Sequence, residues 1–236
     1  MASARSGKLR TKSGTTRRRR VISTRLRSNV TTAGSQERTP DSVKPFPTFE
    51  WGSELPKLKG ERLVLRHLKA SDAGDLFAIF GDPEVIRYWS SPAQKTQTES
   101  LELINEAHKH FVARTMFEWG AVLRETDRLI GTFTLLNVDI AHRRAEVGYA
   151  LNQEFWGGGY ATEGLELLIG FAFGPMNLHR LEADVHPDNE GSFRLLERQG
   201  FVREGYLRER WFHLGRIEDG VFLGLLRPDW IKLKEV

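Results

Sequence analysis

The stretch ALNQEFWGGGYATEGLELLIGFAF, residues 150–173, places three consecutive glycines between an aromatic pair and a long apolar run. A glycine-rich turn that leads into a helix leaves the N–H groups of the first helical turn free, at the positive end of the helix dipole. Such a turn binds anions, because no side chain keeps an anion away from these groups. The stretch therefore predicts a phosphate-bearing ligand at Gly157, Gly158 and Gly159. The alternative is a tight turn that only lets the helix approach a sheet.

Spacing excludes the two most familiar phosphate-binding loops. A dinucleotide-binding G-x-G-x-x-G needs glycine or alanine at its sixth place, which counted from Gly157 is Thr162. A nucleoside-triphosphate loop ends in Gly-Lys-Ser/Thr, and no lysine occurs between Gly157 and Gly174. The phosphate must therefore belong to another class of ligand.

The pattern around the glycines predicts the fold class. Apolar and polar spacing predicts a strand over 61–68, a helix from about 71, a helix over 97–115, and strands over 117–123, 128–138 and 143–151. After the glycines it predicts a helix to about 174, a strand near 181–186, a helix over 189–199, and two strands that turn near 213–216. An antiparallel meander followed by strand–helix alternation indicates an α/β (α+β mixed) fold with a mixed sheet.

Three motifs in this order resemble the GNAT superfamily of acyl-CoA-dependent N-acyltransferases, and in particular its RimJ/RimL-like branch. The first is the segment FWGGGYATE at 155–163, and the second is EVGYAL at 146–151 on the preceding strand. The third is Asn-x-x-Ser-x-x-Leu-x-x-x-x-Gly-Phe, which stands here as Asn189, Ser192, Leu195, Gly200 and Phe201. The resemblance runs from about Leu58 to Pro228.

The resemblance implies a GNAT fold, with a central, mostly antiparallel sheet of about seven strands, two of them splayed, and about four flanking helices. It implies acetyl-CoA as cosubstrate and no metal. The pyrophosphate would lie on the backbone N–H groups of Trp156, Gly157, Gly158, Gly159, Tyr160 and Ala161. The pantetheine arm would follow Tyr149, Ala150 and Leu151 like an added strand, facing Asn189 and Ser192.

Two positions depart from the family pattern. The broader superfamily motif begins with Gln or Arg where this chain has Trp156, which leaves the phosphates almost wholly to the backbone. The superfamily often places a tyrosine proton donor on the helix after the asparagine, where this chain has Leu196. The missing donor favours an alternative in which the protein binds acyl-CoA but turns it over weakly.

Acetyl transfer to an amine needs a neutral amine, a stabilised oxyanion and a protonated leaving thiolate. Glu146 is the candidate base or water-orienting residue, and its alternative role is a surface carboxylate paired with Arg143 or Arg144. Ser192 is the candidate acid or thiol-positioning group, and its alternative role is an ordinary first-turn helix serine. The resemblance also places Glu209 and Trp211 at the acceptor site.

The charge is divided unevenly along the chain. Residues 1–36 contain ten of the 35 Lys and Arg residues and none of the 31 acidic residues, so the rest holds 25 basic and 31 acidic groups. Residues 1–50 are expected to form a disordered basic tail and 51–236 a GNAT acetyltransferase domain. The tail has the composition of an organelle transit peptide, of a polyanion-binding arm, or of an extension without a role.

Composition limits the function further. The chain has no cysteine, hence no disulfide, thiolate metal site or cysteine nucleophile, and no apolar run approaches the ~20 residues of a membrane span. We expect a cytoplasmic N-acetyltransferase, monomeric or homodimeric, that acts on a primary amine, most plausibly a protein N-terminus. Polyamines, amino acids and aminoglycosides are the alternative acceptors, and nucleic acid would be bound only through the basic tail.

Overall fold

The computed structural model describes residues 49–89, 91–213 and 215–235. The expectation of a disordered tail therefore falls outside the described residues, except at Phe49 and Glu50. Phe49 is packed, because its ring lies edge-on to that of Phe171 at 5.1 Å between centroids. The described part of the chain is therefore packed from its first residue, Phe49.

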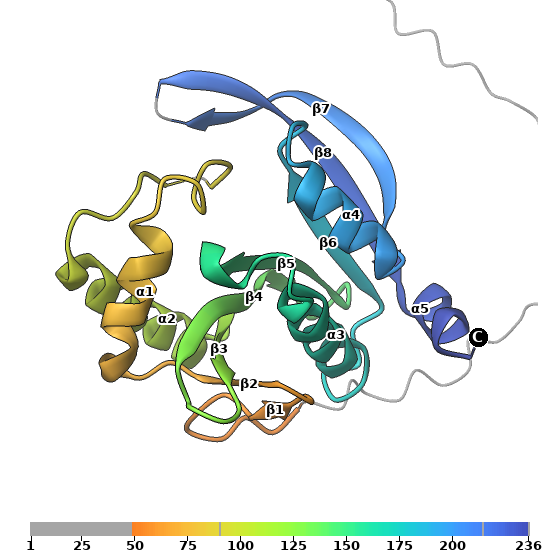
Figure 1. Ribbon diagram of the computed structural model, residues 1–236. Coiled ribbons are helices and arrows are strands. Elements are labelled where there is room, and N and C mark those ends of the chain that lie inside the picture. The colour runs from red at the N-terminus through yellow and green to blue at the C-terminus, as the bar shows by residue number, and fades with distance from the viewer. Residues whose placement is uncertain (1–48, 90, 214, 236) are drawn as a thin grey trace, which may run out of the picture. The chain divides into compact units, whose positions relative to one another are not determined.

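Eight strands form one sheet in the order β1-β2-β3-β4-β5-β6-β8-β7 (Figure 1). Their bounds are β1 Leu58–Lys59, β2 Leu63–His67, β3 Phe117–Leu123, β4 Leu129–Asp139, β5 Arg144–Leu151, β6 Arg180–Val185, β7 Val202–His213 and β8 Arg216–Leu226. All neighbouring pairs are antiparallel except β5 and β6, which are parallel. The mixed, mostly antiparallel sheet and the β3–β4–β5 meander confirm the sequence prediction, with one strand more than expected.

Five α-helices accompany the sheet in the described residues, one more than expected. They are α1 Ala73–Phe80, α2 Gln97–Ala113, α3 Tyr160–Phe173, α4 Glu190–Arg198 and α5 Arg227–Lys234, and short 3-10 helices cover Ala70–Asp72 and Gln153–Phe155. None of the helices in the described ranges combines the length and apolarity of a membrane span. The same ranges contain no group of three or more His, Cys, Asp or Glu side chains that could hold a metal ion.

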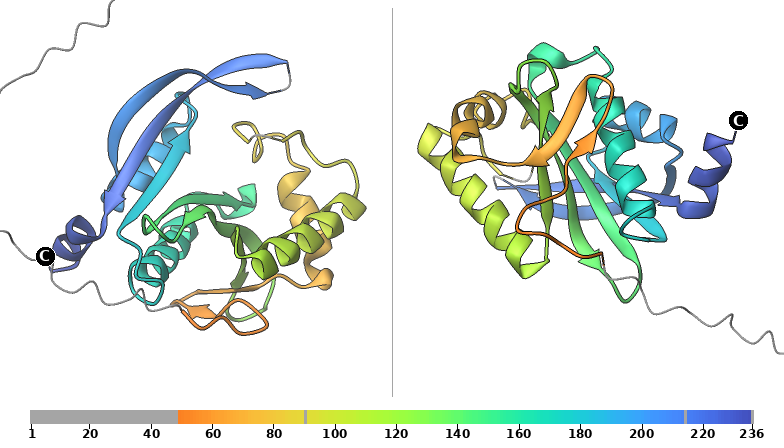
Figure 2. Two further views of the ribbon diagram at one scale, coloured as in Figure 1. Left: turned by 180° about the vertical axis from the view of Figure 1, so that it is seen from behind. Right: turned by 90° about the horizontal axis from the view of Figure 1, so that it is seen from below.

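The helices divide between the two faces of the sheet. Alternate strand residues such as Trp119 and Phe133 pack with Leu165 and Leu168 of α3 in one core. Residues from the opposite face, including Val122, pack with Leu76 of α1 in a second core that α2 also joins. Figures 1 and 2 show α1 and α2 on one side of the central strands and α3 on the other.

Strands β5 and β6 form a fork. They pair only through Arg144↔Arg180, Ala145↔Leu181 and Glu146↔Glu182, and beyond Glu146 they diverge (Figure 1). The backbone of β5 is therefore unpaired on this side from Val147 onward. The splayed central strands that the resemblance implied are thus present, and Glu146 lies at the vertex.

Candidate active site

The glycine turn at the start of α3 has the geometry that only glycine adopts readily. Gly157 and Gly159 have φ angles of 73° and 80°, in the left-handed region. A Cβ atom placed on Gly157 would meet no atom within 4 Å, so the space in front of the turn is open. The close approach of helix to sheet is made further along, at Gly164, where a Cβ would lie 2.2 Å from the Phe133 ring. The helix–sheet contact thus accounts for Gly164 but for none of the three consecutive glycines.

The turn presents a row of free N–H groups. The backbone N–H groups of 157–162 make no hydrogen bond within the part of the chain that the structure describes, whereas Glu163 N–H donates to the Gly159 carbonyl at 3.1 Å. Trp156 differs from the expectation, because its backbone N–H donates to the Gln153 carbonyl at 3.1 Å. Six donors therefore remain free, and they begin one residue later than predicted.

A basic side chain lies beside this turn, which the sequence analysis did not find. The Arg62 guanidinium donates to the Gly158 carbonyl at 2.8 Å and lies over the Tyr160 ring at 4.4 Å. Its Nη2 atom is 3.2 Å from where a Cβ of Gly159 would stand. Glu163 holds Arg62 there, since it accepts the Arg62 backbone N–H at 2.7 Å and its Nε–H at 3.0 Å. Arg62 is 101 residues from Glu163 in sequence, so no local sequence pattern predicts the contact.

The unpaired edge of β5 offers backbone groups to the gap between β5 and β6. Asn152 N–H donates to Ile130 on β4 at 2.9 Å, and backbone groups alternate sides along a strand. The groups of Val147, Tyr149 and Leu151 therefore face the gap, whereas Ala150 faces β4. Of the three residues assigned to the pantetheine arm, Tyr149 and Leu151 are oriented for it and Ala150 is not.

The Trp156 side chain closes the end of this edge. Its indole N–H donates to the Leu151 carbonyl at 2.9 Å, so the glycine turn is tied to the last residue of β5. The ring itself is half exposed. Trp156 therefore supports the turn through its side chain, while its backbone N–H is occupied.

Two hydroxyl groups meet beside the N-terminus of α4. Asn189 caps this helix, because its side-chain oxygen accepts the Ser192 N–H at 3.1 Å. The Tyr149 hydroxyl is buried and without a hydrogen-bond partner, although Ser192 is close enough to affect it. Burial raises the pKa of Tyr149 to about 12, and Ser192 offsets part of this rise. Leu196, at the position where the superfamily often has a tyrosine proton donor, is buried in the core.

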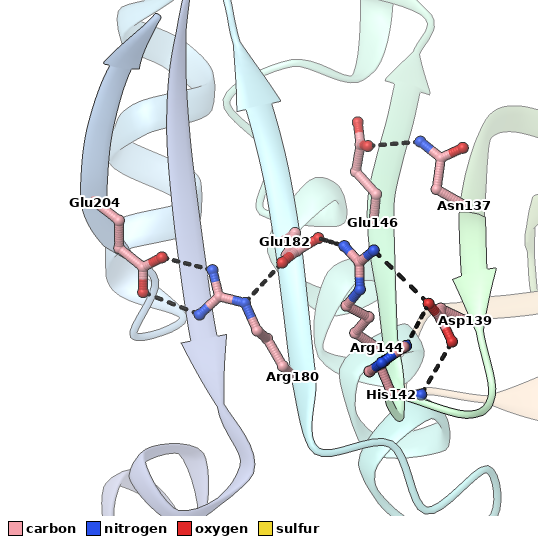
Figure 3. Close-up of polar contacts among 8 residues, drawn as sticks. All are labelled: Asn137, Asp139, His142, Arg144, Glu146, Arg180, Glu182 and Glu204. Carbon is pink, nitrogen blue, oxygen red and sulfur yellow. Dashed lines mark hydrogen bonds and ion pairs between the residues drawn. The ribbon is translucent and has the colours of Figure 1, made fainter. Parts of the chain in front are cut away.

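Glu146 is free of the arginines beside it in sequence. Figure 3 shows its carboxylate accepting from the Asn137 amide, at 2.9 Å, while Arg144 turns to Glu182 and Asp139. Arg143 donates to the Asn177 carbonyl. Burial raises the pKa of Glu146. The side-chain partner of Glu146 is therefore Asn137, while Arg144 is engaged with Glu182.

A ladder of charges fastens the closed end of the fork. Figure 3 shows it crossing the strands from Glu204 to Arg180, Glu182, Arg144, Asp139 and His142, with N···O distances of 2.5–3.8 Å. A second bridge crosses β8 nearby, where Arg210 pairs with the buried carboxylate of Asp184 at 2.8 Å. The Arg144–Glu182 pair thus ties β5 to β6 below Glu146, whereas the Arg210–Asp184 bridge joins β7 to β6 on the open side.

The opposite side of the gap is bounded by the segment after α1 and by the β7–β8 hairpin. The Tyr88 hydroxyl donates to the Asp188 carbonyl at 3.2 Å, and its ring stacks on His186 at 4.9 Å. On β7, Glu209 lies in a bulge, and its backbone N–H donates to the Asp219 carboxylate at 2.7 Å. Trp211 follows in the same strand and is 41% exposed. Four of these residues, His186, Asp188, Glu209 and Asp219, line one pocket.

The chain was compared with known protein families and structures. Residues 62–202 match the family model described as an acetyltransferase (GNAT) domain. The chain is 33% identical over 174 residues to the protein named "Uncharacterized N-acetyltransferase YoaA" of Bacillus subtilis (strain 168), covering 74% of this chain and 98% of that protein. It is 30% identical over 195 residues to the [ribosomal protein uS5]-alanine N-acetyltransferase of Escherichia coli (strain K12), covering 77% and 97%.

Among solved structures, the spermidine N-acetyltransferase from Vibrio cholerae in complex with CoA and spermine superposes with a TM-score of 0.64. The two are 26% identical, and the match covers 73% of this chain and 99% of that one. The family match covers more than half of the chain, and the fold and the relatives agree with it. The chain belongs to the GNAT acetyltransferase family and is an N-acetyltransferase.

Proposed function

We propose that this protein transfers an acetyl group from acetyl-CoA to the α-amine of a protein N-terminus. The observation that carries the proposal is the fork at Glu146, which brings an unpaired strand edge, a cradle of free N–H groups and a carboxylate to one gap. The relative that acetylates the alanine of ribosomal protein uS5 supports this acceptor. An α-amine has a pKa near 8, so it needs little help to become neutral.

The cofactor's pyrophosphate would lie on the N–H groups of Gly157, Gly158, Gly159, Tyr160 and Ala161, with Thr162 completing the row. Arg62 would add the positive charge that Trp156 does not supply. The pantetheine arm would pair with Tyr149 and Leu151 in the gap, as an added strand pairs with a sheet edge. The open space in front of Gly157 supports this arrangement.

The chemistry divides between the two sides of the gap. Glu146 orients the amine or a water beside the thioester and keeps the nitrogen lone pair free to attack the carbonyl carbon. As the C–N bond forms, the C–S bond breaks and the thiolate leaves toward the N-terminus of α4. Ser192, with Tyr149 beside it, donates hydrogen bonds to this thiolate, and the helix dipole favours the negative charge there.

A polyamine is the second candidate acceptor. Four carboxylates lie on the open side of the fork, those of Glu146, Asp184, Glu209 and Asp219, and Arg210 pairs with Asp184. An acidic entrance attracts a cationic substrate. The solved relative that holds CoA and spermine supports this acceptor class.

The acceptor is tested by following thiol release from acetyl-CoA with alanine- and serine-starting peptides, spermidine, free amino acids and an aminoglycoside. The highest kcat/KM with the peptides is the expected result, and a higher value with spermidine would transfer the proposal to the second candidate. Tight CoA binding with no thiol release from any acceptor would overturn both and leave a cofactor-binding module.

The role of Glu146 is tested in the same assay. Glu146→Gln should lower kcat by about 100-fold, because a positioned base contributes roughly that much, and should leave acetyl-CoA binding intact. Glu125→Gln, which changes an exposed carboxylate in the turn after β3, is the matched control. Equal kcat for Glu146→Gln and Glu125→Gln would remove Glu146 from the mechanism.

A further inference from the structure

A second buried carboxylate lies on the same face of the sheet as Glu146. Glu118 is on β3 and is only 8% exposed. Its neighbours in the ladder are Thr134 on β4 and Gly148 on β5, which form one row across three strands. Residues that pair directly across strands share a face, and Glu146 is two residues from Gly148. Glu118 and Glu146 therefore point to the same side, away from α3.

Glu118 has no charged partner. The described residues contain no ion pair to its carboxylate, and the only group that affects it is the Thr132 hydroxyl. This hydroxyl is itself buried and makes no hydrogen bond of normal geometry. Burying a carboxylate without a charged partner is costly, so the presence of Glu118 at this position points to a use.

The charged groups that surround this face are engaged elsewhere. Arg66 on β2 pairs with Asp72 and Asp127. The Asp75 carboxylate on α1 accepts the Leu129 N–H, and the His108 ring on α2 is bonded to the Leu68 carbonyl. Glu146, on β5, is bound to Asn137. Burial, opposed only by Thr132, raises the pKa of Glu118 to about 7. Such a carboxyl group exchanges a proton readily at neutral pH.

One row of the sheet leads from Glu118 on β3 to Gly148 on β5, the strand that forms the fork. A Cβ atom on Gly148 would meet only Leu136 at 3.4 Å and Thr134 at 3.9 Å, which is ordinary contact. With strands spaced at ~4.8 Å, Glu118 and Gly148 are about 10 Å apart at their Cα atoms, and the glutamate side chain spans part of this. The hydroxyls of Thr132 and Thr134 lie on the strand between them.

We infer that Glu118 is the proton acceptor for the incoming amine, reached from the fork through the hydroxyl groups of Thr132 and Thr134. The ammonium form of the acceptor loses one proton along this route and Glu118 becomes a neutral carboxylic acid. The neutral amine attacks the thioester at the fork, the C–S bond breaks, and the proton that the nitrogen then loses neutralises the thiolate. Glu118 returns its own proton to solvent. The inference rests on the proposed function and adds a residue to it, since Glu146 then orients the amine without having to store its proton.

The test uses the whole chain, with spermidine and an alanine-starting peptide as acceptors. Glu118→Gln should lower kcat/KM for the amine by at least about 100-fold, leave the KM for acetyl-CoA unchanged, and abolish the rise of activity with pH near 7. Thr132→Val should lower kcat by a smaller factor, because it removes one hydroxyl group of the route and leaves Glu118 in place. Glu102→Gln, an exposed carboxylate on α2, is the control.

A second measurement keeps the inference testable if a variant misfolds or is inactive. Because the folded-state pKa of Glu118 lies above its ordinary value, the wild type loses stability as pH rises from about 4.3 to 7. Glu118→Gln should lack this loss, so its thermal stability relative to wild type should increase over that range. Full activity with an unchanged pH profile in Glu118→Gln would overturn the inference, as would an unchanged stability profile. Absence of turnover in the wild type with every amine would instead overturn the proposed function.

Discussion

The two ends of the β5–β6 junction are built in opposite ways. Below Glu146, charged side chains bridge four strands, and a glycine on β8 makes room for one of the bridges. A Cβ on Gly224 would lie 2.6 Å from both Arg180 and Glu204. Above Glu146, the backbone is unpaired and the glycines of the α3 turn leave open space. Glycine thus makes room for protein side chains at the closed end and for a ligand at the open end.

The largest effect is expected from filling the open end. Gly159→Glu places a carboxylate where the pyrophosphate is proposed to lie and beside Arg62, which it would neutralise. Acetyl-CoA affinity should fall by more than about 100-fold, or about 2.7 kcal/mol. Calorimetric titration with CoA measures this directly.

Two controls separate charge from strain at this turn. Gly159→Ala keeps the unfavourable φ of 80° without adding charge, and should weaken binding much less. Gly170→Glu adds the same charge to the same helix at a position where a Cβ meets no atom within 4 Å, and should bind CoA normally. Retained binding by Gly159→Glu would show that the phosphates lie elsewhere.

A smaller effect, on stability and not on binding, is expected from breaking the closed end. Arg180→Met removes the cation shared by Glu182 and Glu204. Because the pair is partly exposed, the free energy of unfolding should fall by about 1–2 kcal/mol, less than the 3–5 of a fully buried pair. Urea unfolding at pH 7 measures it, and CoA affinity should change little because the open edge is untouched.

The pH dependence checks the cause of this effect. Arg180 lowers the pKa of Glu204, so the contribution of the pair is present above the ordinary pKa of glutamate and is lost as pH falls through the lowered value. The difference between Arg180→Met and wild type should therefore shrink in acid. Lys109→Met, which breaks an exposed pair with Glu106 on α2, should change stability little at any pH. A larger loss for Lys109→Met would contradict this account of the closed end.

The comparison also shows what a sequence reveals. The open end was predictable, because its glycines, the helix start and the preceding strand are contiguous, and their spacing predicts strand, turn and helix directly. The splay of the strands came from the family resemblance. The residues whose position depends on distant strands were missed: Arg62 reaches the turn from β2, and Glu118 shares a face with Glu146 only through the register of β3, β4 and β5.

Some assignments made from motif positions differ from the orientation of the backbone groups. Trp156 and Ala150 were assigned to the cofactor by their positions in the motifs. However, the Trp156 N–H is bonded within the 3-10 turn before the glycines, and the backbone of Ala150 faces β4. The pairing of Glu146 with Arg143 or Arg144 was weighed from sequence proximity. Ion pairs across strands follow the sheet order, which places Arg144 beside Glu182 instead.

The smallest effect is expected where one hydrogen bond joins the open edge to the turn. Trp156→Phe keeps an aromatic ring but loses the indole N–H that donates to the Leu151 carbonyl at 2.9 Å. The carbonyl can then accept from solvent, so the cost should be that of one ordinary hydrogen bond, about 1 kcal/mol. CoA affinity should fall by roughly 3- to 10-fold, because the turn would no longer be held at the distance from β5 that the phosphates and the pantetheine arm require together. The melting temperature should be almost unchanged. Trp211→Phe is the matched control, since this indole is similarly exposed, 41% against 50%, and donates no hydrogen bond within the described chain. Equal CoA affinities for the two variants would mean that the glycine turn holds its shape without the strand, and that the open end is organised by α3 alone.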